Sequence, residues 1–357
     1  MDKVFKIGII GTGGISNCHI RGYLANPNAE VYAMCDINPE RVKSMAEKYG
    51  VPLERTFTDK DEMLKALPEL DAVSVCTWNN AHAECSIAAL NAGKHVLCEK
   101  PMAMNTEQAL AMQEAAKKAG KLLMLGFVRR HYAETKVVKE YVDSGFLGDL
   151  YYAKCTYLRR NGNPGGWFGD SARSGGGPLI DLGVHIIDLS RYLVGNPQPV
   201  AAYGATFQKL YNRPNIIKGS AYTSVDAKAD EKCDVEDLAT AIIRFDNGAV
   251  LNVETSFCLN IKRDRGTVEI FGTKGGAQIE PDIEIYTDIN NRLVDISLND
   301  TKSLTFEDSF AVEMDHFIDC IAGKTECIAP AEDGVALMKI LDAVYESART
   351  GHEVIIK

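Results

Sequence analysis

The chain has 357 residues, of which 46% are hydrophobic and 25% charged, a composition typical of a globular protein large enough for two domains. Its net charge of −10 repels nucleic acid, and no apolar run approaches the roughly 18–20 residues that span a bilayer. The first residues lack the apolar core of a secretion signal. We therefore expect a cytoplasmic protein with no nucleic-acid or membrane partner.

The first 125 or so residues alternate apolar strands with helical segments. Continuous apolar runs are typical of strands that a parallel sheet buries on both faces. Helix starts are marked by Asn38-Pro39 and by Asn105 or Thr106. The pattern predicts a doubly wound α/β domain. Its expected strands cover residues 6–10, 31–35, 71–77, 95–98 and 122–127.

The glycine loop after the first strand is a candidate cofactor site. Gly11 and Gly13 supply the first two positions of a G-x-G-x-x-G fingerprint, and Ser16 replaces the third glycine. Asp36 follows the second strand, where a carboxylate can bind both ribose hydroxyls of NAD and repel the extra phosphate of NADP. Arg41 could offset that repulsion, so NAD is favoured and NADP is the alternative. Asp36 could instead cap a helix, although Asn38 fills that role better.

The sequence Glu99-Lys100-Pro101 ends the strand over residues 95–98. Open α/β sheets bind ligands at the carboxyl ends of their strands. A lysine there can hydrogen-bond a reacting hydroxyl and stabilise developing alkoxide charge. The alternative is a solvated cation.

Beyond residue 126 the chain is expected to be a second domain. A helix is predicted over residues 132–143, a strand over 150–158 and a glycine-rich loop over 161–177. From residue 197 onward the pattern is that of antiparallel sheet, with Asp246-Asn247-Gly248 as a hairpin turn. The last helix is predicted over 333–350. The expected domains are thus residues 1–125 and 126–357.

Between these parts lies a segment that we expect to be helical from about Asp181. Asp181, His185 and Asp188 then share one face, at i, i+4 and i+7. A carboxylate one turn from an imidazole can orient a base that accepts a proton near neutral pH. The same pattern also fits a partly buried histidine satisfied by a local aspartate.

Ten cysteines are spread along the chain without a C-x-x-C pair. Most lie in apolar runs, as Cys35, Cys76, Cys98 and Cys320 do, where a thiol packs as a small hydrophobic group. The sequence therefore predicts reduced cysteines and no metal site.

Taken in order, four motifs resemble those of the glucose–fructose oxidoreductase/inositol dehydrogenase/MocA (Gfo/Idh/MocA) family of NAD(P)-dependent oxidoreductases. They are the loop over residues 11–16, Asn80-Ala81-His82, the run over 92–101 and Asp181-x-Gly183-x-His185-x-x-Asp188. The resemblance covers essentially the whole chain. It implies an N-terminal Rossmann domain and a C-terminal α/β domain built on a large, mostly antiparallel sheet. The open face of that sheet would form a homodimer or homotetramer.

The resemblance also implies roles for individual residues. Lys100 would polarise a substrate hydroxyl, His185 would accept its proton, and Asp181 would orient His185 or bind an adjacent hydroxyl. Asp188 matches the motif but equally suits a structural role. The candidate cofactor-binding residues are Gly11, Gly13, Gly14, Ile15, Asp36, Arg41, Thr77, Asn79, Asn80, His82, Glu99 and Lys100. The candidate substrate-binding residues are Lys100, Arg129, Trp167, Asp181 and His185.

Other positions keep two interpretations. Asn80 and His82 are expected in a loop lining the nicotinamide ribose, where Trp78 would either close over the cofactor or pack the loop. One of Arg129 and Arg130 would reach a polar substrate while the other is solvated. Trp167 would stack on a sugar ring or anchor its loop.

The resemblance predicts an enzyme that transfers a hydride between NAD(P) and a secondary alcohol of a sugar, inositol or related polyol. Two alternatives share the fold: a glycosidase that retains NAD, and a non-catalytic nicotinamide-binding sensor. The chain lacks a histidine-rich signature for the glycosidase, and its intact catalytic positions argue against the sensor.

Overall fold

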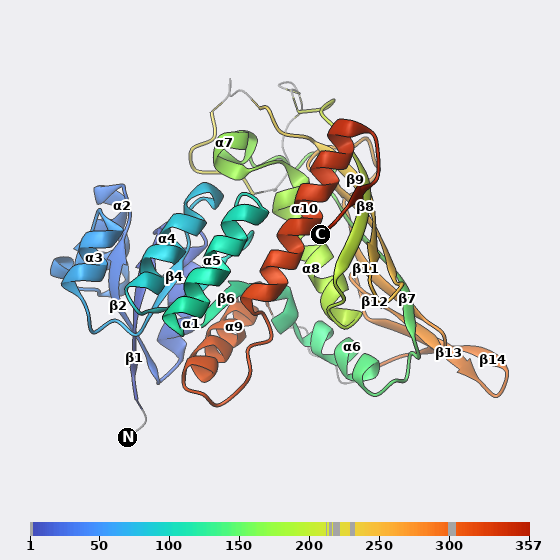
Figure 1. Cartoon of the computed structure of the whole chain (residues 1–357), viewed down its shortest axis with the longest axis horizontal. Helices are drawn as coiled ribbons and strands as arrows, with labels where there is room; N and C mark the ends of the chain where they lie inside the picture. Colours follow the sequence, from blue (N-terminus) through green and yellow to red (C-terminus); the bar gives the residue numbers. More distant parts are fainter. Residues whose placement is uncertain (1–2, 212, 214–215, 217–221, 229–232, 299–304) are drawn as a thin grey trace. The chain divides into compact units, whose positions relative to one another are not determined.

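The computed structural model describes residues 3–211, 213, 216, 222–228, 233–298 and 305–357 (Figure 1). The chain divides into two compact units: a first unit of residues 1–131 with 304–335, and a second unit of residues 132–303 with 336–357. Among the described residues no helix combines the length and apolar character needed to cross a bilayer.

A parallel sheet forms the centre of the first unit. Within the described residues it has six strands in the order β3-β2-β1-β4-β5-β6. The buried apolar runs became these strands, as predicted, and the doubly wound fold is confirmed; only the two-residue β3 was not anticipated. The strands are β1 (Phe5–Ile10), β2 (Ala29–Cys35), β3 (Thr56–Phe57), β4 (Ala72–Val75), β5 (His95–Glu99) and β6 (Leu123–Gly126).

The strand order reverses direction between β1 and β4. After β1 the chain adds β2 and β3 on one side, and it then returns to add β4, β5 and β6 on the other. Such a reversal opens a crevice at the carboxyl ends of the two central strands. The glycine loop follows β1, so it lies at this crevice.

The helices of the first unit begin and end at recognisable residues. Asn38 caps α2 by accepting from the Arg41 N–H at 3.1 Å, and Asn105, not Thr106, caps α5. Helices α3, α4 and α5 pack in a row, and α1 packs on α9 (Figure 1). The helices are α1 (Ser16–Ala25), α2 (Pro39–Tyr49), α3 (Lys60–Ala66), α4 (Asn79–Asn91), α5 (Thr106–Ala119) and α9 (Phe306–Ile321), with 3-10 turns η1 (Leu53–Arg55) and η2 (Val128–His131).

Helix α9 was not predicted, although its start carries a capping box between Thr305 and Asp308. It packs closely on α1 because Gly22 has no side chain: a Cβ there would lie 2.6 Å from Met314 Cγ. The expected division at residue 126 stays a proposal for the domain organisation, and α9, although late in the sequence, belongs to the first unit.

A mostly antiparallel sheet forms the second unit, as predicted. In the described part of the chain it has nine strands in the order β14-β13-β12-β11-β7-β10-β9-β8-β15, and β7 and β10 pair in parallel. Asn247 and Gly248 make the predicted hairpin turn between β9 and β10. The strands are β7 (Leu150–Leu158), β8 (Pro199–Phe207), β9 (Leu238–Phe245), β10 (Val250–Ser256), β11 (Arg265–Gly272), β12 (Gly275–Ile279), β13 (Glu284–Ile289), β14 (Arg292–Ile296) and β15 (Val354–Ile355).

Helix α8 packs on this sheet, against β7 and β11. Its apolar side chains Ile186, Leu189 and Leu193 are buried, as is Leu182 in the turn before it. The helices of the second unit are α6 (Ala133–Asp143), α7 (Ser171–Ser174), α8 (Val184–Leu193) and α10 (Ala331–Thr350) from residue 336 onward, with the 3-10 turn η3 (Gly166–Gly169) and the π turn η4 (Leu179–Gly183).

Candidate active site

The glycine loop of the first unit is shaped by two glycines with different tasks. Gly11 has φ +90°, and a Cβ on it would lie 2.7 Å from the Cys76 carbonyl, at the end of β4. Packing within the chain therefore requires Gly11. A Cβ on Gly13 would meet no atom within 4 Å. The chain's own packing does not require Gly13, which leaves open space above the loop for a ligand.

The third fingerprint position is filled by Ser16, the first residue of α1. Its hydroxyl donates to the Gly13 carbonyl at 2.7 Å, and the residue is fully buried. Serine thus closes the loop where the fingerprint has glycine. Gly14 is exposed and Ile15 half-buried at the start of α1. The positive end of a helix dipole and free backbone N–H groups at such a start favour a phosphate group.

Asp36 is buried at the end of β2, where it organises the glycine loop. Its Oδ2 accepts from the Thr12 N–H at 2.8 Å and from the Thr12 hydroxyl at 2.9 Å, and its Oδ1 accepts from the Asn38 N–H at 2.9 Å. Arg41 Nη1 lies 3.7 Å from Oδ2. A carboxylate has about four acceptor positions, so capacity for a ribose hydroxyl remains.

The Glu99-Lys100-Pro101 turn is held through Glu99. The Glu99 side chain is buried; it accepts from His19 Nε2 at 2.8 Å and from the Lys100 N–H at 3.2 Å. Burial is the largest single influence and raises the pKa of Glu99, but the His19 hydrogen bond and the charges of His19, Lys100 and His82 together outweigh it, so this pKa lies below its usual value. Lys100 is half-buried, and the Lys100–Pro101 bond is cis.

A buried hydrogen-bond chain supports His19. Its Nδ1 lies 3.2 Å from the Ser74 hydroxyl on β4, which in turn lies 2.7 Å from the Tyr23 hydroxyl on α1. Sequence reasoning missed these residues, because 80 positions separate His19 from Glu99 and 55 separate it from Ser74.

The expected loop after β4 is instead the first turn of α4. Trp78 is half-buried at its N-cap, Asn79 is buried and Asn80 exposed. His82 is buried, with Nδ1 2.7 Å from the Pro101 carbonyl and Nε2 3.2 Å from the Thr77 carbonyl. Burial lowers the pKa of His82. Its ring therefore fastens the turn at Pro101 to the end of β4.

The expectation that one of Arg129 and Arg130 is solvated is wrong, since both are buried in η2. Arg130 Nη1 donates to Asp333 Oδ2 at 2.8 Å and to the Ile328 carbonyl. Arg130 is thus held by contacts within the first unit. Arg129 stays a candidate for substrate binding.

In the second unit, the Asp181–His185 segment begins earlier than expected and with a different helix type. The π turn η4 starts at Leu179, and the Val184 N–H reaches the Leu179 carbonyl five residues back. Asp181 lies in this wider turn and His185 in α8; both are half-buried, whereas Asp188 is only 2% exposed. The burial of Asp188 favours its structural interpretation. Short π segments frequently occur at functional sites.

A buried carboxylate holds the start of that turn. Glu236 Oε2 accepts from the Gly177 N–H at 2.9 Å, and its Oε1 accepts from the Leu179 N–H at 3.1 Å and the Tyr345 hydroxyl at 3.0 Å. Burial raises the pKa of Glu236. A Cβ on Gly177 would lie 2.2 Å from the Glu236 carbonyl, and one on Gly176 2.0 Å from the Tyr345 hydroxyl. The glycine run thus lets these two side chains approach the backbone.

Trp167 lies half-buried in η3 of the second unit. Its ring centroid is 4.0 Å from that of Phe168, which in turn lies 6.1 Å from the Tyr222 ring. This aromatic group is compatible with both interpretations of Trp167.

Comparison with known proteins gives matches over both parts of the chain. The family description "Oxidoreductase family, NAD-binding Rossmann fold" matches residues 5–127, and "GFO/IDH/MocA C-terminal domain" matches residues 135–278. A D-glucoside 3-dehydrogenase of Escherichia coli K12 is 36% identical over 352 residues, covering 98% of this chain and 97% of the relative.

Two further similar proteins are also named as dehydrogenases. A myo-inositol 2-dehydrogenase of Thermotoga maritima is 32% identical over 270 residues, covering 76% of this chain and 73% of that protein. The solved structure of a levoglucosan dehydrogenase in complex with NADH has a TM-score of 0.87 at 26% identity, covering 99% of this chain and 100% of that one.

Proposed function

The chain belongs to the Gfo/Idh/MocA family of NAD-binding oxidoreductases, and we propose that it oxidises a secondary alcohol of a sugar, inositol or related polyol with NAD as hydride acceptor. It shares the family's dehydrogenase activity and NAD-binding Rossmann domain. The similar proteins are named as dehydrogenases of a D-glucoside, myo-inositol and levoglucosan. A glucoside-like substrate is the first to test.

The residues of the first unit fit NAD. The space above Gly13 and the start of α1 suit a pyrophosphate, and the Asp36 carboxylate keeps acceptor capacity for a ribose. When bound, the nicotinamide supplies the hydride acceptor. Arg41 near Asp36 keeps NADP as the alternative cofactor.

The observation that carries the catalytic proposal is the way the backbone around Lys100 is held. Glu99, fixed by His19, accepts from the Lys100 N–H, and the next carbonyl, that of Pro101, bonds to His82. A side chain on so constrained a backbone is preorganised. In this proposal the Lys100 ammonium donates to the substrate hydroxyl and stabilises the alkoxide that develops as the hydride leaves.

His185 is the proposed proton acceptor, because an imidazole changes charge near neutral pH and this one is half-buried at the start of α8. Asp181, in the π turn before it, would orient His185 or bind a neighbouring hydroxyl. Glu236 supports the proposal by holding the Gly177 and Leu179 N–H groups at the start of the π turn that carries Asp181. Arg129 and Trp167 are proposed substrate contacts, and Thr77, Asn79 and Asn80 proposed cofactor contacts.

The experiment is a panel of glucosides, free sugars and inositols with NAD, in which NADH absorbance is compared with the amount of keto product. We expect one NADH per keto product. Replacing His185 by Ala should reduce turnover by roughly 10²–10⁴-fold, the loss typical of a general base. Replacing the exposed His352 by Ala should leave turnover unchanged. No NADH with any substrate, or full turnover in His185→Ala, would contradict the proposal.

The same panel separates the two alternatives. Release of an aglycone without net NADH formation would indicate the NAD-retaining glycosidase. Nicotinamide binding without turnover of any substrate would indicate the sensor. The match to the oxidoreductase family and the similarity to named dehydrogenases favour the oxidoreductase over both alternatives.

We also propose a cytoplasmic homodimer or homotetramer that assembles through the open sheet face. Tyr203 on β8 and Ile242 on β9 are direct cross-strand neighbours, and both are about half exposed. Adjacent exposed apolar side chains on a sheet favour a protein–protein contact.

A further inference from the structure

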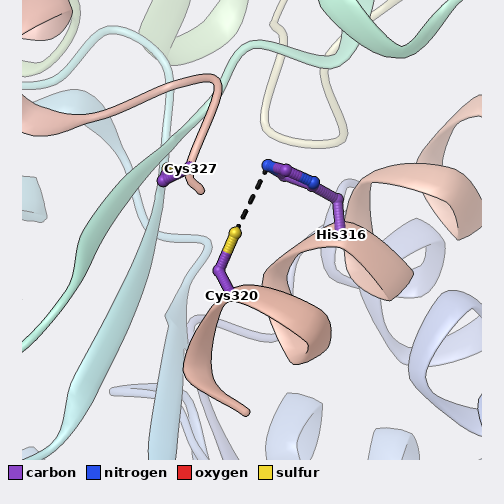
Figure 2. A group of neighbouring side chains, drawn as sticks. All are labelled: His316, Cys320 and Cys327. Atoms are coloured by element: carbon purple, nitrogen blue, oxygen red, sulfur yellow. Dashed lines mark hydrogen bonds between the residues drawn. The ribbon is translucent and has the colours of Figure 1, made fainter. Parts of the chain in front are cut away.

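A histidine and two cysteines converge at the end of helix α9, in the first unit. His316 and Cys320 are four residues apart and so share a helix face. The helix ends at Ile321, and Gly323, with φ +72°, reverses the chain. Cys327 thereby returns to the same face (Figure 2).

The three side chains are arranged as metal ligands. The ligand atoms of His316, Cys320 and Cys327 all lie within 4.8 Å of one another, and His316 Nε2 is 3.4 Å from Cys320 Sγ. Zinc binds thiolates at about 2.3 Å and imidazoles at about 2.0 Å, so ligands of a tetrahedral ion are separated by about 3.4–3.8 Å. Shifts of about an ångström or less would close the site.

The hydrogen bonding of His316 is compatible with a metal ligand. The Ile328 N–H donates to His316 Nε2 at 3.1 Å, so this nitrogen is unprotonated, and a bound cation would replace that hydrogen bond. A thiolate is the form of cysteine that binds metal.

A second, independent observation concerns His131, at the end of η2. It is 8% exposed, and in the described part of the chain its Nε2 has no hydrogen-bond partner. Its ring centroid lies 5.3 Å from that of His316. Two imidazoles on one tetrahedral zinc ion have ring centroids about 5 Å apart, because each centroid lies about 3.2 Å from the metal.

We propose that His131, His316, Cys320 and Cys327 form a structural binding site for a soft divalent cation, with Zn²⁺ as the first candidate. The ion would tie η2 to the end of α9 and to the loop that follows it. Cys320 lies among apolar neighbours in the sequence, but it also lies one helical turn after His316, and this spacing makes it a candidate ligand. The site takes no part in the proposed oxidation.

The test is zinc binding by reduced, metal-free protein in competition with a chromophoric chelator. We expect one Zn²⁺ per chain, with affinity at least 100-fold weaker in Cys320→Ser and in Cys327→Ser. His131→Gln should weaken binding about tenfold, since outer or fourth ligands contribute factors of this order. The matched control Cys233→Ser, a half-buried cysteine of the second unit, should bind zinc normally.

A second measurement on the unchanged protein does not depend on how the variants fold. Cobalt(II) bound at this site should show a thiolate-to-cobalt charge-transfer band and the strong visible absorption of a tetrahedral ion. The proposal is overturned if the reduced protein takes up no zinc, if the cysteine variants bind zinc as tightly as the unchanged chain, or if bound cobalt lacks the thiolate band.

Discussion

Asp36 has a structural task besides its proposed contact with the ribose. Its oxygens accept from the Thr12 N–H and hydroxyl and from the Asn38 N–H, so the carboxylate joins the glycine loop to the start of α2. Discrimination between NAD and NADP would come from its charge, because a phosphate beside a buried carboxylate is repelled.

Replacing Asp36 by Ser removes the charge and keeps a small polar side chain. We expect the ratio of kcat/KM with NAD to kcat/KM with NADP to fall by about tenfold or more, which is about 1.4 kcal/mol or more. Steady-state kinetics with both cofactors measures it. Asp59→Ser, which alters an exposed helix cap at α3, serves as control and should leave the ratio unchanged. An unaltered cofactor preference in Asp36→Ser would refute the role given to Asp36.

Glu313 on α9 is fully buried, and within the described residues neither of its carboxylate oxygens has a hydrogen-bond partner. Burial, followed by the charge of Glu99, raises the pKa of Glu313 well above 4.5. The folded state therefore keeps a proton that the unfolded chain loses above pH 4.5. Stability from this residue is complete below that pH and falls as the pH rises towards the folded pKa.

Glu313→Gln should remove this pH dependence, since glutamine is neutral throughout. The melting temperature of the variant minus that of the unchanged chain should increase as the pH rises from about 5 to 8. Thermal unfolding across this range measures the difference. Glu114→Gln, at an exposed site on α5, should show a flat difference. A flat difference for Glu313→Gln as well would mean that Glu313 is ionised in the folded protein.

At the scale of elements, the start of α8 depends on contacts from distant parts of the second unit. Glu236 and Tyr345 reach the glycine run that precedes the π turn, and the turn carries Asp181. Gly176 and Gly177 permit this approach. The segment is therefore held by Glu236, just before β9, and by Tyr345 in α10. The proposed base thus lies on a supported backbone.

Tyr345→Phe tests this support by deleting one hydroxyl. Loss of a hydrogen bond to a buried carboxylate should cost about 1.5–3 kcal/mol of stability. We expect kcat to fall several-fold while KM for NAD is unchanged, because the proposed NAD contacts lie in the first unit. Tyr151→Phe, at an exposed site on β7, is the control. An unchanged kcat in a less stable Tyr345→Phe protein would limit Tyr345 to a structural role.

Much of the fold was predictable because local rules decide it. Continuous apolar runs gave β1, β2, β4, β5 and β6, and the Asn38 and Asn105 caps fixed helix starts. The π turn was not predictable, because its wider turn departs locally from the period of 3.6 residues by which a helix is recognised in a sequence. Helix α9 could have been found from the capping box at Thr305.

The candidate site was predictable only in part. Motifs identify Gly11, Asp36 and Lys100, because each follows a strand at the ligand-binding edge of the sheet. The residues that hold them, such as His19 beneath Glu99, are joined through contacts across many positions in sequence, and no local pattern marks them. The convergence of Cys327 on His316 depends likewise on a chain reversal at Gly323.

At the scale of the whole molecule, the proposed assembly can be tested on the open sheet face. Ile242→Lys places a charge beside the exposed Tyr203. We expect it to shift the protein from dimer or tetramer to monomer in light scattering coupled to size exclusion, because burying an unpaired charge is costly. Leu110→Lys, at an exposed site on α5, should leave the assembly intact. An unaltered assembly in Ile242→Lys would place the interface elsewhere.

The central claim is hydride transfer from a sugar or polyol carbon to NAD. The most direct measurement uses a substrate of the panel whose carbon-bound hydrogens are replaced by deuterium, with mass spectrometry of the NADH formed. The account predicts one deuterium in each NADH and a keto group on the substrate. Both products should be lost in Lys100→Met and likewise in His185→Ala. NADH without deuterium, or a keto product formed without NADH, would contradict it.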